Sequence, residues 1–98
     1  MYTIVWHYRV SAGRERDFEA YYGAAGPWVE LFRRANGFRE TSLLRDVERP
    51  DEYVTIDRWD SADDYRRFRE EFRHEYSRLD ADADALTSTE HHVCGVES

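Results

Sequence analysis

Large apolar side chains alternate with smaller or polar ones at the start of the chain. Between Tyr2 and Val10 every second residue is large and apolar, and a period of two residues is typical of a β-strand with one buried face. The intervening side chains include His7 and Arg9. The pattern predicts a strand over 2–10 with an aromatic-rich inner face and a mixed outer face.

After Ser11–Gly13 the apolar residues recur at the spacing of a helix. The positions on this stripe are Phe18, Tyr21, Tyr22, Ala25, Trp28, Leu31, Phe32 and Ala35. Gly23, Gly26 and Pro27 interrupt the stripe, and proline is favoured at the first position of a helix but costly inside one. We therefore expect a broken helix whose second piece begins at about Pro27 and ends at Asn36–Gly37.

Two further strands are expected in the middle of the chain. They extend over Phe38–Val47 and Glu52–Asp60, and the segment between them contains Pro50, which is typical of a turn. Two strands joined by so short a turn form a β-hairpin.

A second helix is predicted behind Ser61, because Ser61 and Asp64 have the spacing of a helix N-terminal capping box. Apolar residues follow at helical spacing, namely Tyr65, Phe68, Phe72, Tyr76 and Leu79. The alternation of Asp and Ala from Asp80 to Ala85 prolongs or frays this helix. The segment Thr87–Glu97 is predicted to be the last strand, broken near Gly95.

The order β-α-β-β-α-β predicts one domain, residues 1–98, of the α+β class. In the ferredoxin-like arrangement the four strands form an antiparallel sheet with both helices on one face. The other face then has no cover from the chain itself, and Val54 and Ile56 accompany Arg58 there. We expect a homodimer that closes sheet against sheet.

Charge and composition narrow the possible partners. The net charge is -7, and the 14 basic residues, all arginine, are interspersed with acids, so no basic stripe is available for nucleic acid. No apolar run has the length of a membrane helix, and the N-terminus lacks the features of a signal peptide; a soluble cytoplasmic protein is expected. Aromatics make up 15% of the residues, which favours a ligand pocket or a partner interface.

Three segments carry a resemblance to a known family. The strings YYGAAGPWVELFRRANGFRETSLLRD, YVTIDRWDS and LTSTEHHVCG resemble the antibiotic biosynthesis monooxygenase (ABM) family of dimeric α+β barrels. The resemblance implies a cavity in each subunit, between sheet and helices, for small aromatic or polyketide-like ligands. Some members oxygenate phenolic polyketides without a cofactor, others bind and degrade haem, and others handle small metabolites.

The residues that haem-degrading relatives use are not found at the matching positions. Where those members carry an Asn on the first strand this chain has Trp6, and where many members carry a His behind the strand tryptophan it has Phe68. In the segment TEHHVC, alternation would place Glu90, His92 and Cys94 on one face, but three ligands on one flat strand match no familiar metal site. We therefore expect no haem, no metal and no other bound cofactor.

Cofactor-free oxygenation needs a group that removes a proton from the substrate and a group that stabilises an oxyanion. The candidates for the base are His7, His91, His92 and Asp57, and those for the stabiliser are Arg58, a Tyr hydroxyl or a Trp N–H. We take His7, Asp57 and Arg58 as the catalytic set. The structural alternatives stay open: Asp57 accepting hydrogen bonds from Arg or backbone groups, and His7 hydrogen-bonded within the dimer.

Aromatic residues from several elements are the candidates for the wall of the cavity, since ligand pockets are mostly apolar and aromatic with a few polar groups. The set is Trp6, Tyr8, Trp28, Phe32, Trp59, Phe68, Phe72 and Tyr76. Asp57 and Trp59 are two residues apart on one strand and share its face. We expect them at the margin of the cavity, where the second helix begins.

Three functions remain open. The first is a dimeric, cofactor-independent monooxygenase acting on a small aromatic or polyketide-like metabolite. The second is a non-catalytic dimer that binds such a ligand, or haem. The third is a structural dimer whose cavity is filled by its own aromatic side chains. A cavity no larger than a few water molecules would favour the third function over the other two.

Overall fold

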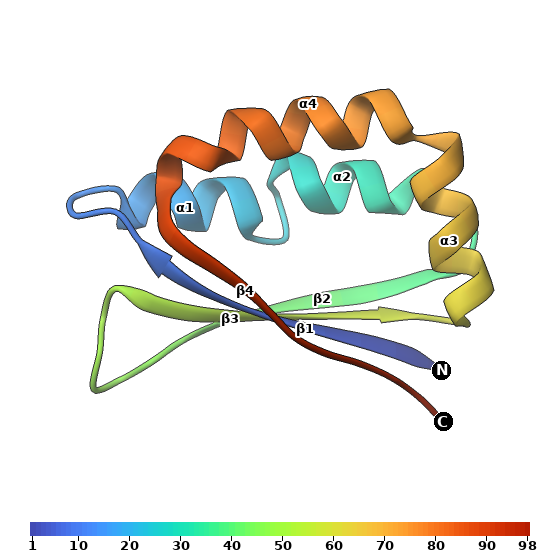
Figure 1. Ribbon diagram of the computed structural model, residues 1–98, viewed down its shortest axis with the longest axis horizontal. Coiled ribbons are helices and arrows are strands. Elements are labelled where there is room, and N and C mark those ends of the chain that lie inside the picture. Colours follow the sequence, from blue (N-terminus) through green and yellow to red (C-terminus); the bar gives the residue numbers. More distant parts are fainter.

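Four strands form one antiparallel sheet, and all helices lie on one of its faces, in the computed structural model of residues 1–98 (Figure 1). The elements are β1 (Tyr2–Val10), α1 (Glu15–Tyr22), α2 (Pro27–Arg33), β2 (Phe38–Arg45), β3 (Glu52–Trp59), α3 (Ala62–Glu71), α4 (Arg73–Ala83), a 3₁₀ turn (Asp84–Leu86) and β4 (Thr87–Glu97). The strand order is β2-β3-β1-β4. The predicted ferredoxin-like βαββαβ fold is confirmed.

The predicted break in the first helical segment is confirmed, because α1 ends at Tyr22 and α2 begins at Pro27. Gly26 makes the junction possible, since a Cβ at this position would collide with the carbonyl oxygens of Ala20 and Tyr21. Pro27 occupies the first turn of α2, where its missing N–H costs nothing. The junction lets α2 present Trp28 and Phe32 to the core.

The second helix differs from the prediction of one continuous helix behind Ser61. The chain turns sharply at Phe72, so that α3 stands at one end of the sheet and α4 runs back over it (Figure 1). Phe68 and Phe72 are both buried, and this bend brings both rings into the core. No Gly or Pro marks the position, so packing rather than local propensity breaks the helix. The predicted cap is confirmed, with Ser61 Oγ accepting the Asp64 N–H at 3.1 Å.

The hairpin has the predicted strands with shorter ends. β2 stops at Arg45 rather than Val47, and β3 stops at Trp59 rather than Asp60. The Asp46 carboxylate accepts the backbone N–H groups of Glu48 and Arg49 at 2.8 and 3.1 Å. These bonds replace ladder pairing and begin the turn early.

The predicted break near Gly95 is wrong, because β4 is continuous through this residue. Its register against β1 instead shifts between Val5 and Trp6, where Cys94 pairs with Val5 and His92 pairs with Trp6. The extra residue, Val93, is a β-bulge. Cys94 therefore shares the outer face with Val5, and the expectation that it lies on one face with His92 is corrected.

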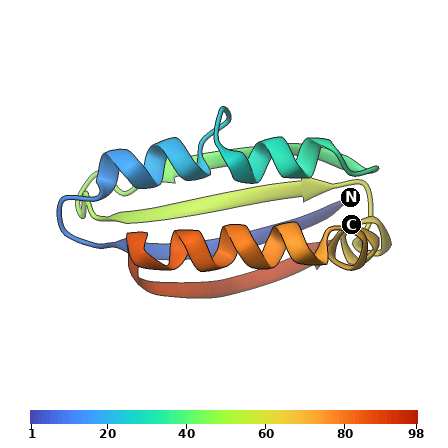
Figure 2. The same ribbon diagram turned by 90° about the horizontal axis from the view of Figure 1, so that it is seen from above.

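The core lies between the sheet and the helices. Figure 2 shows α1 and α2 along the β2–β3 side of the sheet and α4 along the β1–β4 side. Aromatic residues dominate this core, and Trp59 at its centre is 0% exposed. None of the helices has the length and apolar character required to cross a membrane.

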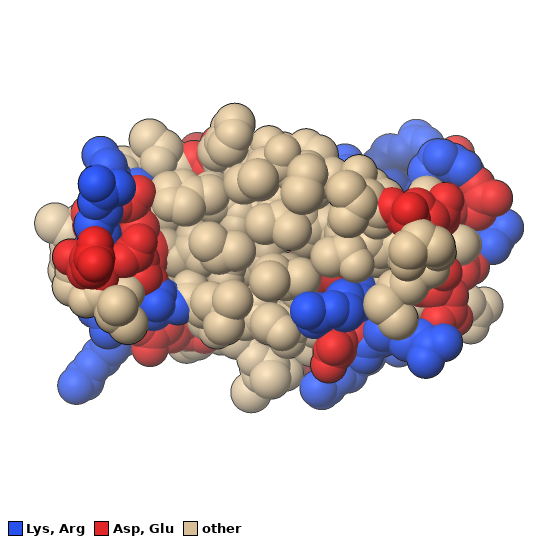
Figure 3. Space-filling model, turned by 90° about the horizontal axis from the view of Figure 1, so that it is seen from below, with Lys and Arg blue, Asp and Glu red and all other residues tan.

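The opposite face of the sheet is not covered by any element of the chain (Figure 1). Figure 3 shows this open face, with charged side chains gathered toward its ends and a largely uncharged middle. Exposed apolar residues include Leu44 at 50%, Val93 at 51% and Val96 at 56%. A sheet face of this kind is unusual for an isolated small domain.

Candidate functional site

A pocket lies between the inner face of the sheet and the helix layer. It is lined by Trp6, Tyr8, Tyr22, Trp28, Phe32, Thr41, Thr55, Asp57, Tyr65, Tyr76, Asp80 and Glu90. Every strand and every α-helix contributes at least one of these residues. The cavity volume is about 40 Å³, which is room for about three water molecules.

Strand alternation builds the floor of the pocket. The register pairs Trp6 with Thr55 across β1 and β3, and Thr41 with Asp57 across β2 and β3. Directly opposed residues of antiparallel strands share a face, so these four side chains all point toward the helices. Three neighbouring strands thus place two hydroxyls and one carboxylate under an aromatic roof.

Asp57 is the polar centre of this floor. Its carboxylate accepts a hydrogen bond from the Thr41 hydroxyl at 2.7 Å, and no arginine or backbone N–H bonds to it, contrary to the structural alternative considered for this residue. Burial raises the pKa of Asp57 to about 6, and the Thr41 hydrogen bond opposes that rise. Asp57 lines the pocket directly instead of lying at its margin. The group is therefore an acid that titrates near neutral pH.

Three of the tyrosines that line the pocket keep their protons. Burial raises the pKa values of Tyr8, Tyr22 and Tyr76 well above the usual value for a phenol. The Tyr8 hydroxyl accepts from Thr55 Oγ1 at 3.4 Å. As neutral phenols these groups are hydrogen-bond donors at every pH at which the protein would work.

The indole N–H of Trp28 is a hydrogen-bond donor in the wall of the pocket. The residue is 6% exposed, and its buried indole N–H makes no hydrogen bond of normal geometry within the chain. The Tyr22 hydroxyl is close enough for the indole N–H to lower its pKa slightly against the larger effect of burial. An unpaired buried donor costs free energy, and in a pocket wall it is a group that a ligand oxygen can satisfy.

Two members of the predicted catalytic set, His7 and Arg58, do not line this pocket. Both lie on the open face of the sheet, where His7 Nε2 is 3.1 Å from Glu52 Oε1 and Arg58 donates to Glu40 Oε1 at 3.1 Å. Glu52 is buried and also lies within 4 Å of two arginines. His7 is paired with Glu52 on the open face. A hydrogen-bonded histidine of this kind is the structural alternative that we considered for this residue.

Five of the eight predicted wall residues line the pocket: Trp6, Tyr8, Trp28, Phe32 and Tyr76. The other three, Trp59, Phe68 and Phe72, are buried in the aromatic core and do not line it. Trp59 packs edge-on against Phe32 and Phe38, at 5.8 and 5.3 Å between ring centroids. These three residues support the wall instead of forming it.

The sequence reasoning missed six lining residues: Tyr22, Thr41, Thr55, Tyr65, Asp80 and Glu90. The period of two that places Asp57 on the inner face also places Thr55 there, so this residue could have been found. Asp80 and Glu90 gave no comparable signal, because one lies in an Asp/Ala tract and the other on an edge strand. Burial, with Asp80 and Asp84 adding to it, raises the pKa of Glu90.

The remaining titratable groups do not form a metal centre. No three His, Cys, Asp or Glu side chains are gathered so that they could hold a metal ion. Cys94 is a free thiol, and the bulge at Val93 separates it from the face that carries His92.

The chain combines an α+β fold with an aromatic pocket between the sheet and the helix layer. Residues 1–92 match the sequence model of the family described as antibiotic biosynthesis monooxygenase, and the chain belongs to this family. A comparison with curated proteins finds no match.

Solved structures share the fold over almost the whole chain. SnoaB from Streptomyces nogalater, described as a cofactor-independent oxygenase, is 25% identical with a TM-score of 0.80, covering 99% of this chain and 91% of that chain. A candidate antibiotic biosynthesis monooxygenase from Bordetella bronchiseptica is 26% identical with a TM-score of 0.74, covering 99% and 95%. A NIPSNAP family protein from Agrobacterium tumefaciens is 9% identical with a TM-score of 0.71, covering 98% and 90%, and shows the fold alone.

Proposed function

We propose that this protein is a cofactor-independent monooxygenase that acts on a small aromatic or polyketide-like molecule bound in the pocket. The observation that carries the proposal is the Asp57 carboxylate, which lies on the floor of an aromatic pocket with a pKa raised to about 6. A general base is most effective when its pKa lies near the working pH. The likeness to SnoaB, described as a cofactor-independent oxygenase, supports the same class of reaction.

The reaction follows from proton removal. Asp57 takes a proton from an activated C–H of the substrate, such as the methylene of an anthrone, and leaves an electron-rich carbanion. One electron passes to dioxygen, the substrate radical and superoxide combine to a C–O bond, and the peroxide takes the proton that Asp57 holds. Asp57 then removes the second C–H proton, the C=O bond forms, the O–O bond breaks, and hydroxide leaves and is protonated to water. One substrate and one dioxygen give one quinone and one water.

Neutral donors in the wall stabilise the charge that develops on the substrate oxygen. The phenol of Tyr8 keeps its proton because burial raises its pKa, and the Trp28 N–H makes no hydrogen bond of normal geometry within the chain. Hydrogen-bond donors that are already in position stabilise a developing charge more strongly where water is excluded. In this proposal, these two groups take the oxyanion-stabilising role that Arg58 was expected to have.

The small volume of the cavity has to be reconciled with a ligand. A space for about three water molecules is the size that favoured a purely structural dimer. The lining nevertheless keeps an indole N–H without a hydrogen bond of normal geometry and a carboxylate with a single hydrogen bond, and both groups could bind a polar group of a ligand. A ligand of two or three rings enters if the short helix α2 moves as a unit about the Gly26–Pro27 junction at its start.

We further propose that two copies associate through the open face of the sheet. This face carries the exposed Leu44 and Val96 and has a largely uncharged middle (Figure 3). The partner would cover the His7–Glu52 pair. A second copy is the occupant that matches a self-complementary, two-fold interface.

Oxygen uptake tests the proposed function. The protein is mixed with anthrone and a panel of naphthols under air, without flavin and with a metal chelator, and oxygen consumption is followed with an electrode. The proposal predicts enzyme-dependent uptake of one dioxygen per quinone formed. Ligand binding, seen as quenching of tryptophan fluorescence, with no oxygen uptake for any compound would instead support the non-catalytic binding protein.

A further inference from the structure

We propose that the pocket selects ligands in which a positively charged amino group is attached to an aromatic ring system. The inference rests on the proposed function, because it names the substrate class of the same pocket. It is drawn from the charge of the lining, from the character of the walls, and from the polar groups that the chain leaves without partners.

The lining is acidic and contains no basic residue. Asp57, Asp80 and Glu90 are three of its twelve residues, and none of the other nine is Arg, Lys or His. None of these three acids takes part in any of the ion pairs of the chain. Burial is the main cause that raises the pKa values of Asp57 and Glu90. A ligand cation would relieve this unbalanced negative charge.

The walls offer ring faces that attract a cation. Seven of the twelve lining residues are aromatic, and Trp28 and Tyr76 meet edge to face at 5.0 Å between ring centroids. The face of an aromatic ring carries negative electrostatic potential, and cages of such rings bind ammonium groups. Carboxylates and ring faces in one pocket therefore favour the same kind of ligand.

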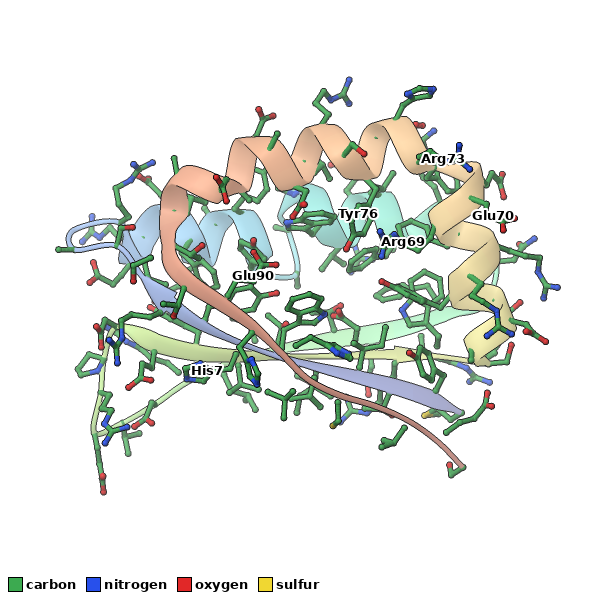
Figure 4. The ribbon with its side chains drawn as sticks, in the orientation of Figure 1. His7, Arg69, Glu70, Arg73, Tyr76 and Glu90 are labelled. Carbon is green, nitrogen blue, oxygen red and sulfur yellow. The ribbon has the colours of Figure 1, made fainter.

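Arg69 shows that these rings accept a cation. Its guanidinium carbon lies 3.8 Å from the centroid of the Tyr76 ring, and its Nη1 donates to the Tyr65 hydroxyl at 3.2 Å. In Figure 4 Arg69, Tyr76 and Glu90 all point into the space between the helix layer and the sheet. Arg69 is exposed and does not line the pocket, and it forms no ion pair with any of the three acids.

A second, independent observation points to a ligand at the same place. The buried Trp28 N–H makes no hydrogen bond of normal geometry within the chain, and Asp57 accepts its one hydrogen bond on Oδ1, which leaves Oδ2 available. Trp28 is buried and Asp57 is partly buried, whereas Asp80 and Glu90 are exposed and form the rim of the lining. The pocket therefore has a polar floor for a substrate oxygen, aromatic walls, and a negative rim for an ammonium group.

The negative charge of the lining also affects the proposed reaction. Proton removal by Asp57 transfers its negative charge to the substrate, in a pocket whose lining also contains Glu90 and Asp80, and like charges repel strongly in a medium of low dielectric. An ammonium group on the substrate, held at the rim, makes the bound intermediate neutral overall. Selectivity for a cationic substrate then lowers the barrier as well as the dissociation constant.

Calorimetric titration with three matched probes tests the inference. The probes are naphthylethylamine, naphthylethanol and naphthylacetate, which share a ring system and carry charges of plus one, zero and minus one. At neutral pH the amine is expected to bind about tenfold more tightly than the alcohol, and the carboxylate least tightly. The doubly substituted Asp80→Asn, Glu90→Gln protein should lose that preference and bind the alcohol unchanged. Asp82→Asn removes one negative charge from the helix that carries Asp80, but outside the lining, and should keep the preference.

The outcomes separate the two proposals. Equal or tighter binding of the alcohol by the natural chain, or an amine preference that survives the double substitution, overturns the amine selectivity and leaves the pocket as a binding site. No binding of any probe by a chain that melts cooperatively overturns the pocket and the proposed function together. Because both substituted acids are exposed and are replaced by amides of the same shape, thermal melting should show an unchanged fold.

Discussion

The Thr41 hydroxyl donates to Asp57 Oδ1 at 2.7 Å, from β2 to β3, and this is the only hydrogen bond that the chain gives to the Asp57 carboxylate. The two residues are direct partners in the sheet register. Burial drives the pKa of Asp57 up to about 6, and Thr41 limits the rise. Burial and the Thr41 hydrogen bond together thus set the pH above which the Asp57 carboxylate is ionised and can act as a base.

Asp57→Asn is expected to stabilise the fold at neutral pH. The pKa of Asp57 is higher in the folded chain than its ordinary value of 3.8, so the folded state binds more protons and loses stability as pH rises between about 4 and 6. Asn keeps an acceptor for Thr41 and carries no charge. Chemical denaturation should show a gain of about 1–3 kcal/mol at pH 8 and little change at pH 4. A loss of stability at pH 8 would mean that the ionised carboxylate holds the fold together.

Thr41→Val should move the pH dependence of activity without removing the base. The hydroxyl lowers the pKa of Asp57, and Val has nearly the same shape but no donor. The midpoint of the pH–rate profile is expected to rise by roughly one unit, with the limiting rate at high pH retained. Thr41→Ser, which keeps the hydroxyl, should restore the original midpoint. An unchanged midpoint in the Val variant would show that Thr41 does not position the base.

Trp28→Phe should weaken ligand binding because it removes the unpaired N–H and keeps an aromatic wall. Trp59→Phe is the matched control, since Trp59 also has a buried unpaired N–H but lies outside the lining. Titration of each variant with naphthylethanol should show a dissociation constant raised about fivefold to tenfold for Trp28→Phe and unchanged for Trp59→Phe. Equal effects of the two substitutions would indicate a general loosening of the core.

Leu44→Glu is expected to dissociate the proposed dimer. Leu44 is 50% exposed on the open face, so the change should leave the folded subunit intact. Each of the two subunits would then place one unpaired charge in the proposed interface. Light scattering should give a dissociation constant at least about a hundredfold higher than that of the natural chain. Val47→Glu, in the hairpin turn at 95% exposure, is the control that should remain a dimer. A natural chain of monomer mass across dilution would contradict the interface.

The fold could be predicted from the sequence because its periodicities are strong and local. Strand β1 has the predicted bounds, and the Gly26–Pro27 junction was marked by residues whose backbone preferences differ from those of a helix. The bend at Phe72 could not be predicted, since it follows from the burial of the Phe72 ring and not from a helix breaker. The bulge at Val93 likewise depends on pairing with β1.

The site was only partly predictable for the same reason. The period of two on β3 placed Asp57 on the inner face, but its position on the pocket floor depends on β2, which supplies Thr41. His7 and Arg58 were chosen for their chemistry, although the alternation of their strands puts both on the open face. Asp80 and Glu90 meet only when α4 packs over the edge strand, which no local pattern encodes.

The rate of oxygen consumption by the natural chain and by Asp57→Asn, measured from pH 5 to pH 9 with anthrone and a chelator, tests the central claim most directly. We expect the rate of the natural chain to rise through a pH of about 6, as Asp57 ionises. For Asp57→Asn we expect a rate at least about a hundredfold lower at every pH, whereas Arg66→Ala, at an exposed helix position, should leave the rate unchanged. Equal rates and equal profiles for the natural chain and Asp57→Asn would show that this carboxylate is not the base, and would contradict the account.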